Sequence, residues 1–331
     1  MGMRILVTGG AGYIGSTVAA QLLELGHRVV VIDDLRRGHR GALPERAELV
    51  VGNVGEEQTL ERAFSAEPVD AVMHFAALAE VGESMQAPEV YFHNNTSNTL
   101  RLIEAMLKHG VSKLVFSSTA AVFGSPERSP IEETAPKRPT NPYGESKLMV
   151  EQMLAWFNQI RGLRYATLRY FNVAGGNPNR GEDHTPESHL IPRILQVALG
   201  QHKSIKIFGD DYPTPDGTCV RDYIHVSDLA QAHVLALDAL NERAPLIYNL
   251  GNGKGFSVRE VVETARRVTG HAIPAEIEGR RAGDPPVLVA SSEKIGRELG
   301  WTPKFAALES IIASAWEWHR THPKGYGDAK A

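Results

Sequence analysis

A tyrosine and a lysine four positions apart are the residues of this chain best suited to acid–base chemistry. They lie in Asn141-Pro142-Tyr143-Gly144-Glu145-Ser146-Lys147, where the Asn and Pro are typical of the cap and first position of a helix. On a helix, Tyr143 and Lys147 share one face, one turn apart. The lysine ammonium favours the phenolate, so the pair could exchange a proton with a substrate hydroxyl near neutral pH. The same spacing also occurs by chance, as a packed Tyr and a surface Lys.

Hydroxyl side chains end an earlier strand-like run, in the segment Phe116–Gly124, which reads F-S-S-T-A-A-V-F-G. In a parallel sheet, the carboxyl ends of the strands border the crevice in which ligands bind. Thr119 is therefore a candidate to hydrogen-bond the reacting oxygen of a substrate. Taken alone, a Ser/Thr cluster at a strand end is as often a turn.

A glycine pattern near the N-terminus predicts a dinucleotide site. The segment Thr8–Gly15 reads T-G-G-A-G-Y-I-G, between a strand-like run and an apolar helical pattern. Gly9, Gly12 and Gly15 would let backbone N–H groups approach a pyrophosphate at the start of that helix.

The acid after the second strand favours NAD over NADP. Asp33 lies 18 residues beyond Gly15, where a carboxylate can accept both ribose hydroxyls and would repel a 2′-phosphate. Arg36 and Arg37 are nearby, but they are more typical of solvated loop charges. A cationic nicotinamide would also favour the phenolate of Tyr143.

The candidate residues can meet only if the strands before them end at the same edge of one sheet. The sequence predicts such a sheet. Runs rich in Val, Ile and Leu predict strands at Arg4–Val7, Val29–Asp33, Glu48–Val51, Ala71–Phe75, Leu114–Ser117 and Ala166–Arg169. Apolar residues at helical spacing predict helices at Tyr13–Leu25, Thr59–Phe64, Tyr91–His109 and Pro142–Ile160. Alternating strands and helices indicate parallel strands with right-handed crossovers. The expected fold class is α/β, a doubly wound parallel sheet of the Rossmann type.

After about Asn172 strands and helices no longer alternate regularly, which predicts a second, smaller domain of mixed α/β structure. The polar stretches 175–186 and 209–217 predict loops, and Ser257–Glu260 has the spacing of a capping box for a helix that ends at Thr269. Other helices are predicted at His189–Leu199, Asp228–Leu240, Ser292–Leu299 and Leu308–His319. We place a dinucleotide-binding domain at 1–172, to which segments near 220–247 could return, and a substrate domain at 173–331.

The composition is that of an ordinary globular protein. Of the 331 residues, 42% are hydrophobic and 22% charged, and the net charge of −4 points neither to nucleic acid nor to a membrane as partner. The single cysteine, Cys219, excludes an internal disulfide and a cysteine-rich metal site, and no metal is assigned. Because no apolar run approaches the ~20 residues of a membrane span, we expect a soluble, cytoplasmic protein.

Nearly the whole chain resembles the extended short-chain dehydrogenase/reductase family and, within it, the UDP-glucose 4-epimerases. The glycine loop and the Tyr-x-x-x-Lys motif mark the superfamily, whereas the block 211–226 is far more specific. The matching segments are Thr8–Gly15, His74–Ala77, Val81–Ser84, Phe116–Gly124, Tyr143–Lys147, Leu168–Asn172, Asp211–Thr214, Gly217–Val226 and Arg280–Asp284. The resemblance implies an NAD-dependent epimerase that interconverts UDP-glucose and UDP-galactose.

The resemblance also implies roles for single residues. Tyr143 would be the base, Lys147 its partner and a ligand of the cofactor ribose, and Thr119 a substrate hydrogen-bonder. The cofactor would further contact Gly9, Gly12, Tyr13, Ile14, Gly15, Asp33, Asn53, Val54, Phe75, Ala76, Asn95, Ser117 and Tyr170. The UDP-sugar would contact Asn172, His189, Leu190, Phe208, Arg221, Tyr223, Arg281, Asp284 and Leu288. Asn53 replaces the family's usual Asp, and an amide can make the same kind of contact.

In the implied reaction, Tyr143 removes the proton of the sugar 4-hydroxyl while the C4 hydride passes to NAD, and the 4-keto sugar rotates before the hydride returns. Related dehydratases carry Asp-Glu after the strand-end Thr, where this chain has Ala120 and Ala121. Another UDP-sugar epimerase or a decarboxylase, acting on an N-acetylhexosamine or a uronate, stays open. A non-catalytic NAD-binding protein is the less favoured alternative.

Two finer expectations follow from the resemblance. Leu288 is intermediate between the bulky and the small residues that relatives place at one wall of the sugar pocket. We therefore expect UDP-glucose and UDP-galactose as the main pair, with N-acetylated sugars slow. Helices within Ser97–His109 and Lys147–Ile160 are expected to form a homodimer contact.

Overall fold

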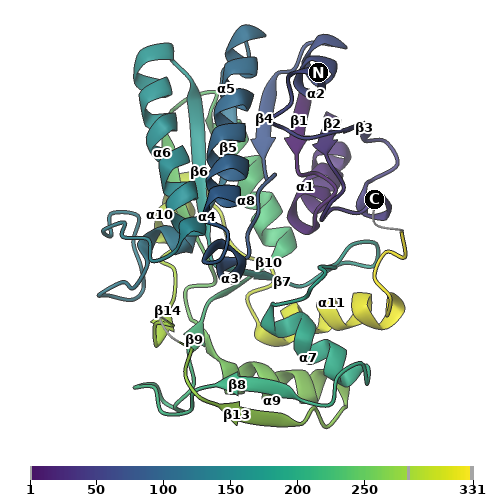
Figure 1. Cartoon of the computed structure of the whole chain (residues 1–331), viewed down its shortest axis with the longest axis vertical. Helices are drawn as coiled ribbons and strands as arrows, with labels where there is room; N and C mark the ends of the chain where they lie inside the picture. The colour runs from purple at the N-terminus through teal and green to yellow at the C-terminus, as the bar shows by residue number, and fades with distance from the viewer. Residues whose placement is uncertain (1, 282–283, 329–331) are drawn as a thin grey trace.

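A parallel sheet of seven strands forms the centre of the larger part of the molecule (Figure 1). The computed structural model describes residues 2–281 and 284–328. In sheet order the strands are β11 (Leu246–Leu250), β6 (Arg164–Tyr170), β5 (Lys113–Thr119), β4 (Ala71–His74), β1 (Arg4–Thr8), β2 (Arg28–Asp33) and β3 (Glu48–Val51). Every neighbouring pair is parallel, which confirms the predicted doubly wound fold.

Helices cover both faces of this sheet, as strands that are apolar on both sides require. One face packs against α1 (Tyr13–Glu24), α8 (Val226–Ala239) and α10 (Glu293–Leu299). The other packs against α2 (Glu57–Ser65), α5 (Asn98–Lys108) and α6 (Pro142–Arg161). Because all strands run the same way, their carboxyl ends meet at one edge of the sheet.

The smaller part lies beyond that edge, in the lower half of Figure 1. Its apolar core joins α7 (Leu190–Ala198), α9 (Val258–Thr269) and α11 (Leu308–Thr321). Short sheets pair β7 (Asn172–Ala174) with β10 (Tyr223–His225), β8 (Ile205–Phe208) with β13 (Ala275–Glu278), and β9 (Val220–Arg221) with β12 (Phe256–Ser257) and β14 (Val287–Leu288). This mixture agrees with the mixed α/β structure expected of the second half.

The chain passes between the two parts more than once. It enters the smaller part after β7 and returns through β10 and α8 to β11, which becomes an edge strand of the large sheet beside β6. It then enters the smaller part again with α9. Several segments, rather than one linker, therefore join the two parts.

One predicted helix, Tyr91–His109, differs from the structure. The segment consists of α4 (Pro88–Tyr91), a π-helical stretch over Phe92–Ser97 and then α5, and a short α3 (Val81–Ser84) precedes it. A π-helical turn admits an extra residue and is frequent at functional sites. This one contains Asn95, which donates hydrogen bonds to the Leu78 carbonyl at 2.9 Å and the Ser146 hydroxyl at 3.1 Å.

Two helix starts predicted from the sequence are confirmed. Asn141 caps α6 by accepting the N–H of Gly144 at 2.8 Å, with Pro142 at the first helical position. Ser257 and Glu260 form both hydrogen bonds of a capping box at α9. Within the described ranges, every helix is too short or too polar to cross a bilayer.

Candidate active site

A cleft of about 1240 Å³ opens at the carboxyl ends of the large sheet, and a side chamber of about 220 Å³ adjoins it. Most of the residues singled out from the sequence line the cleft: Gly9, Gly12, Tyr13, Ile14, Gly15, Asp33, Asn53, Val54, Phe75, Ala76, Ser117, Thr119, Tyr143, Lys147, Tyr170, Asn172, His189, Arg221, Arg281, Asp284 and Leu288. Leu190, Phe208 and Tyr223 line the side chamber instead. Asn95 lines neither, because its amide is turned to Leu78 and Ser146.

The glycine loop brings backbone atoms closer together than side chains would allow. A Cβ on Gly15 would lie 2.2 Å from the carbonyl oxygen of Gly9, and one on Gly9 would lie 2.6 Å from the backbone nitrogen of Ala76. The cap of α1 is Gly12, which offers no side-chain acceptor to the first N–H groups of the helix. These donors therefore face the cleft ready for an anion, and the loop fits a dinucleotide pyrophosphate.

Asp33 is a buried carboxylate at the end of β2. Its Oδ2 accepts the N–H of Ala11 and its Oδ1 that of Leu35, each at 2.9 Å. Burial raises the pKa of Asp33, and the two N–H groups partly offset this rise. Each oxygen keeps a second lone pair, so the carboxylate can still accept ribose hydroxyls.

The two arginines beyond Asp33 have protein partners. Arg36 pairs with Asp34 at 2.7 Å, and Arg37 donates to the carbonyl of Thr185 at 2.8 Å. Asp34 also accepts the amide of Asn53 at 3.2 Å. This pairing agrees with reading the arginines as loop charges.

The start of α6 approaches the end of β5 very closely. A Cβ on Gly144 would lie 2.6 Å from the carbonyl oxygen of Ala121, so only glycine fits here without displacement. The close approach places Tyr143 beside Thr119, whose hydroxyl also accepts the N–H of Ala121 at 3.1 Å. The sequence pattern did not reveal this function of Gly144.

The polypeptide alone does not lower the pKa of Tyr143, contrary to the expectation for its pairing with Lys147. Burial raises that pKa, and a hydrogen bond with Thr119 offsets the rise only in part. Burial also lowers the pKa of Lys147 to about 7, although the charge of Glu151 opposes this change. The Lys147 side chain is enclosed, and its Nζ donates to the Ser117 carbonyl at 2.9 Å. A lysine that is partly neutral at pH 7 exerts less charge on the tyrosine than a full ammonium would.

The lowered pKa of Lys147 predicts a pH-dependent stability. Below about pH 7 the buried ammonium destabilises the folded state, and this cost disappears as pH rises toward the ordinary lysine pKa of about 10.4. Lys147→Met should therefore be more stable than the wild type at pH 6. The advantage should shrink by up to about 1.4 kcal/mol per pH unit above pH 7. Urea unfolding of both proteins between pH 6 and 9 measures this, and a constant difference would contradict it.

A buried ion pair that the sequence analysis did not assign fixes α6 to the sheet. Arg169 donates to Glu151 from Nε at 2.9 Å and from Nη2 at 2.6 Å, and the hydroxyl of Ser118 donates to the same carboxylate at 2.6 Å. The side chains of Arg169 and Glu151 are only 1% and 7% exposed. Glu151 follows Lys147 by one helical turn. The ion pair of Glu151 with Arg169 therefore fixes the face of α6 that carries Tyr143 and Lys147.

The substrate-side residues gather positive charge at the junction of the cleft and the side chamber. Arg221 donates to the carbonyl of Pro285 at 2.8 Å and lies 3.5 Å from Asp284. The guanidinium of Arg281 stacks on the ring of Phe208 at 3.8 Å. A guanidinium fork suits a diphosphate.

Leu288 is half-buried on β14, lines the cleft and packs against the apolar cluster that contains Ala120. Ala120 and Ala121 also line the cleft. Their methyl groups offer no acid or base at the two positions where related dehydratases carry Asp-Glu. Ala282 and Gly283, of the motif that contains Arg281, lie outside the described residues.

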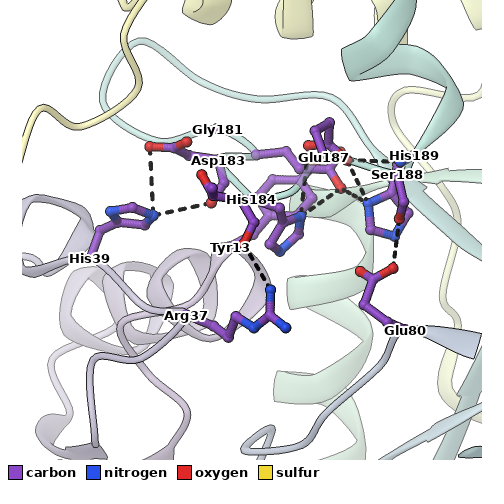
Figure 2. A network of polar contacts seen from close by, with 12 residues as sticks. Tyr13, Arg37, His39, Glu80, Gly181, Asp183, His184, Glu187, Ser188 and His189 are labelled. Atoms are coloured by element: carbon purple, nitrogen blue, oxygen red, sulfur yellow. Dashed lines mark hydrogen bonds and ion pairs between the residues drawn. The ribbon is translucent and has the colours of Figure 1, made fainter. Parts of the chain in front are cut away.

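Figure 2 shows a polar network at the cleft wall. Of its members His184, Glu187 and His189, sequence reasoning singled out only His189. Nδ1 of His189 lies 2.9 Å from Glu182 Oε1 and 3.0 Å from Glu187 Oε1. The Glu182 carboxylate raises the pKa of His189 to about 11, against the effect of burial. Nδ1 of His184 lies 3.3 Å from the same Glu182 oxygen. Two Glu and two His within eight residues were the signal available in the sequence.

The chain is similar to known epimerases over nearly its whole length. Residues 5–251 match the NAD dependent epimerase/dehydratase family. A UDP-glucose 4-epimerase of Halalkalibacterium halodurans is 55% identical over 327 residues, which cover 98% of each protein. A crystal structure of a UDP-glucose 4-epimerase, 51% identical, superposes with a TM-score of 0.96 over 98% of this chain and 100% of that one. The Bifidobacterium longum UDP-glucose 4-epimerase, solved with NAD+ and UDP, is 39% identical with a TM-score of 0.93 over 97% and 99%.

Proposed function

Because this chain belongs to the NAD dependent epimerase/dehydratase family, we propose that it is an NAD-dependent epimerase that interconverts UDP-glucose and UDP-galactose. One observation carries the proposal: Tyr143 and Thr119 adjoin in a cleft that also receives the glycine loop and the two substrate-side arginines. Relatives at this identity named UDP-glucose 4-epimerase support the choice of sugar.

Bound NAD would supply a hydride acceptor that returns the hydride within one turnover. We assign its pyrophosphate to the first turn of α1, its adenosine ribose to Asp33 and its other ribose to Lys147. Tyr143 moves the proton of the sugar hydroxyl, and Thr119 orients that hydroxyl by hydrogen bonding. Arg221 and Arg281 hold the diphosphate, so the nucleotide stays fixed while the sugar turns.

Turnover of each sugar nucleotide in both directions tests this function. The purified protein should convert UDP-galactose to UDP-glucose, and the reverse, without added reductant. Nucleotide released by denaturation should absorb as NAD or NADH. Conversion of a UDP-uronate with release of CO₂, and none of either hexose, would identify the decarboxylase alternative instead.

Asp33 should set the cofactor preference. Asp33→Ser removes charge-assisted hydrogen bonds to the ribose and should weaken NAD binding by about 10–100-fold. Asp33→Asn, which keeps one acceptor oxygen, should lie between this variant and the wild type. Calorimetric titration of cofactor-depleted protein with NAD and NADP measures both affinities. A wild type that prefers NADP would contradict the assignment.

Leu288 should control which sugars are accepted, since it lines the cleft. Leu288→Ser enlarges the pocket and should raise kcat/KM for UDP-N-acetylhexosamines relative to hexoses by about 10–200-fold. Leu288→Tyr should abolish any activity on N-acetylated sugars. The ratio of the two rates in each variant is the measurement, and an unchanged ratio in both would place the pocket wall elsewhere.

We further propose that the protein is a cytoplasmic homodimer in which α5 and α6 meet the same helices of a second copy. In support, α6 exposes Met149, Trp156 and Ile160 on its outer side. We propose that residues 1–172, together with α8 and β11, bind the cofactor. The remaining residues would bind the nucleotide sugar.

A further inference from the structure

We propose that Glu182, His184, Glu187 and His189 form a four-coordinate Zn²⁺ site. One ligand atom of each of the four side chains lies within 4.8 Å of the others. Figure 2 shows His184, Glu187 and His189 of this cluster facing one another. Two imidazole nitrogens with two carboxylate oxygens are donors that zinc takes in tetrahedral sites. Mg²⁺ and Ca²⁺ prefer more ligands, all of them oxygen.

The separations suit a tetrahedron. Ligands at zinc distances of 2.0–2.1 Å stand about 3.3–3.5 Å apart along a tetrahedral edge. Both imidazoles approach Glu182 Oε1, His189 Nδ1 at 2.9 Å and His184 Nδ1 at 3.3 Å. Glu187 lies 3.0 Å from His189 through Oε1 and 3.9 Å from His184 through Oε2, and one ligand atom of each residue lies within 4.8 Å of the others. A small contraction or expansion of each pair would therefore seat the ion.

Charge and hydrogen bonding also favour an ion. The side chains of Glu182 and Glu187 are each only 6% exposed. Among residues 2–281 and 284–328, no lysine or arginine comes within 4.0 Å of either carboxylate. Zinc would take the place of the imidazole protons that now pair with the two buried carboxylates, and its charge would balance them. It would also bind His184 Nδ1, which is buried and lies 3.3 Å from Glu182 Oε1 without the geometry of a hydrogen bond.

The site would brace the loop before α7, which hydrogen bonds already join to the cofactor-binding part. Arg37 holds the Thr185 carbonyl at 2.8 Å, and His39 lies 3.1 Å from the Asp183 carbonyl. The ion would hold this loop against His189, the residue that precedes α7 at the border of the cleft. Since all four ligands are protein side chains, the site is a structural one rather than an activator of water.

Metal content and affinity test the proposal on the full-length protein without reference to activity. Purified protein in metal-free buffer should retain, or after chelation rebind, one zinc per chain, measured by plasma mass spectrometry and by competition with a chelating dye. His184→Asn and Glu182→Gln should weaken zinc affinity by at least about 100-fold, more than the loss of an outer hydrogen bond costs. Asp183→Asn is the matched control, because Asp183 lies in the same loop but pairs with His39 and Tyr326, and its affinity should be unchanged.

A wild type that binds no stoichiometric zinc, or a His184→Asn protein of equal affinity, would show that the cluster holds only paired charges. If the variants fail to fold, the wild type alone decides. Loaded with Co²⁺, it should give the intense visible absorption of a four-coordinate ion, and the weak spectrum of a six-coordinate ion would overturn the proposal.

Discussion

Tyr143→Phe should lower the epimerisation rate by about 10²–10⁴-fold, the usual contribution of a positioned acid–base group. The substitution removes one hydroxyl and keeps the ring that lines the cleft beside Thr119. Binding of the uridine nucleotide should be unchanged, because Arg221 and Arg281 lie elsewhere in the cleft. Initial rates with both sugars, together with calorimetric titration by UDP, measure the two effects separately.

Tyr248→Phe is a matched control for this loss. Tyr248 is fully buried, and its hydroxyl donates to Glu298 at 2.9 Å, outside the cleft. Removing it should leave the rate close to that of the wild type. If Tyr143→Phe also turned over at nearly the wild-type rate, Tyr143 could not be the proton carrier.

Glu151→Gln should lower the free energy of unfolding by about 3–5 kcal/mol, the cost of leaving one partner of a buried ion pair without its counter-charge. The stranded group would be the guanidinium of Arg169, which is 1% exposed. Gln keeps the shape of Glu, so packing changes little. Urea unfolding at pH 7 measures the difference.

The double substitution Glu151→Leu with Arg169→Met separates charge from packing. Replacing both partners by apolar side chains removes the stranded charge, and it should be less destabilising than Glu151→Gln alone. Equal or greater loss in the double variant would mean that the hydrogen bonds of this network, not its charges, hold α6 in place.

The sheet could be predicted because each central strand is buried on both faces and therefore appears in the sequence as a short apolar run. Only the first six of the seven strands were predicted, since β11 (246–250) is an isolated run far along the chain and its place beside β6 depends on tertiary packing. The π-helical stretch around Asn95 was missed for a similar reason. Its hydrogen bonds to Leu78 and Ser146 join segments that no local pattern relates.

The site was predicted where local sequence decides the geometry. In three segments the local residues determine the backbone conformation: the glycine loop, the capped start of α6 and the end of β5. The pairing of Glu151 with Arg169 and the convergence of Glu182 with three neighbours were not predicted, because a loop or two distant elements must fold before the charges meet. The pKa of Tyr143 was expected to fall because the sequence spacing places Lys147 beside it. The spacing does not reveal that both side chains are buried, and burial raises the pKa of Tyr143.

The position of β11 has a consequence for synthesis on the ribosome. Its partner β6 ends at residue 170 and β11 ends at residue 250, so 250 − 170 = 80 residues must still be made before the sheet is complete. At about 5–20 residues per second, this takes about 4–16 s. During that time β6 is an open edge with unpaired backbone groups, a template for contact with other nascent chains. Slow translation of this stretch, or a shortage of chaperones, should therefore lower the yield of native protein more than an equal delay after residue 250.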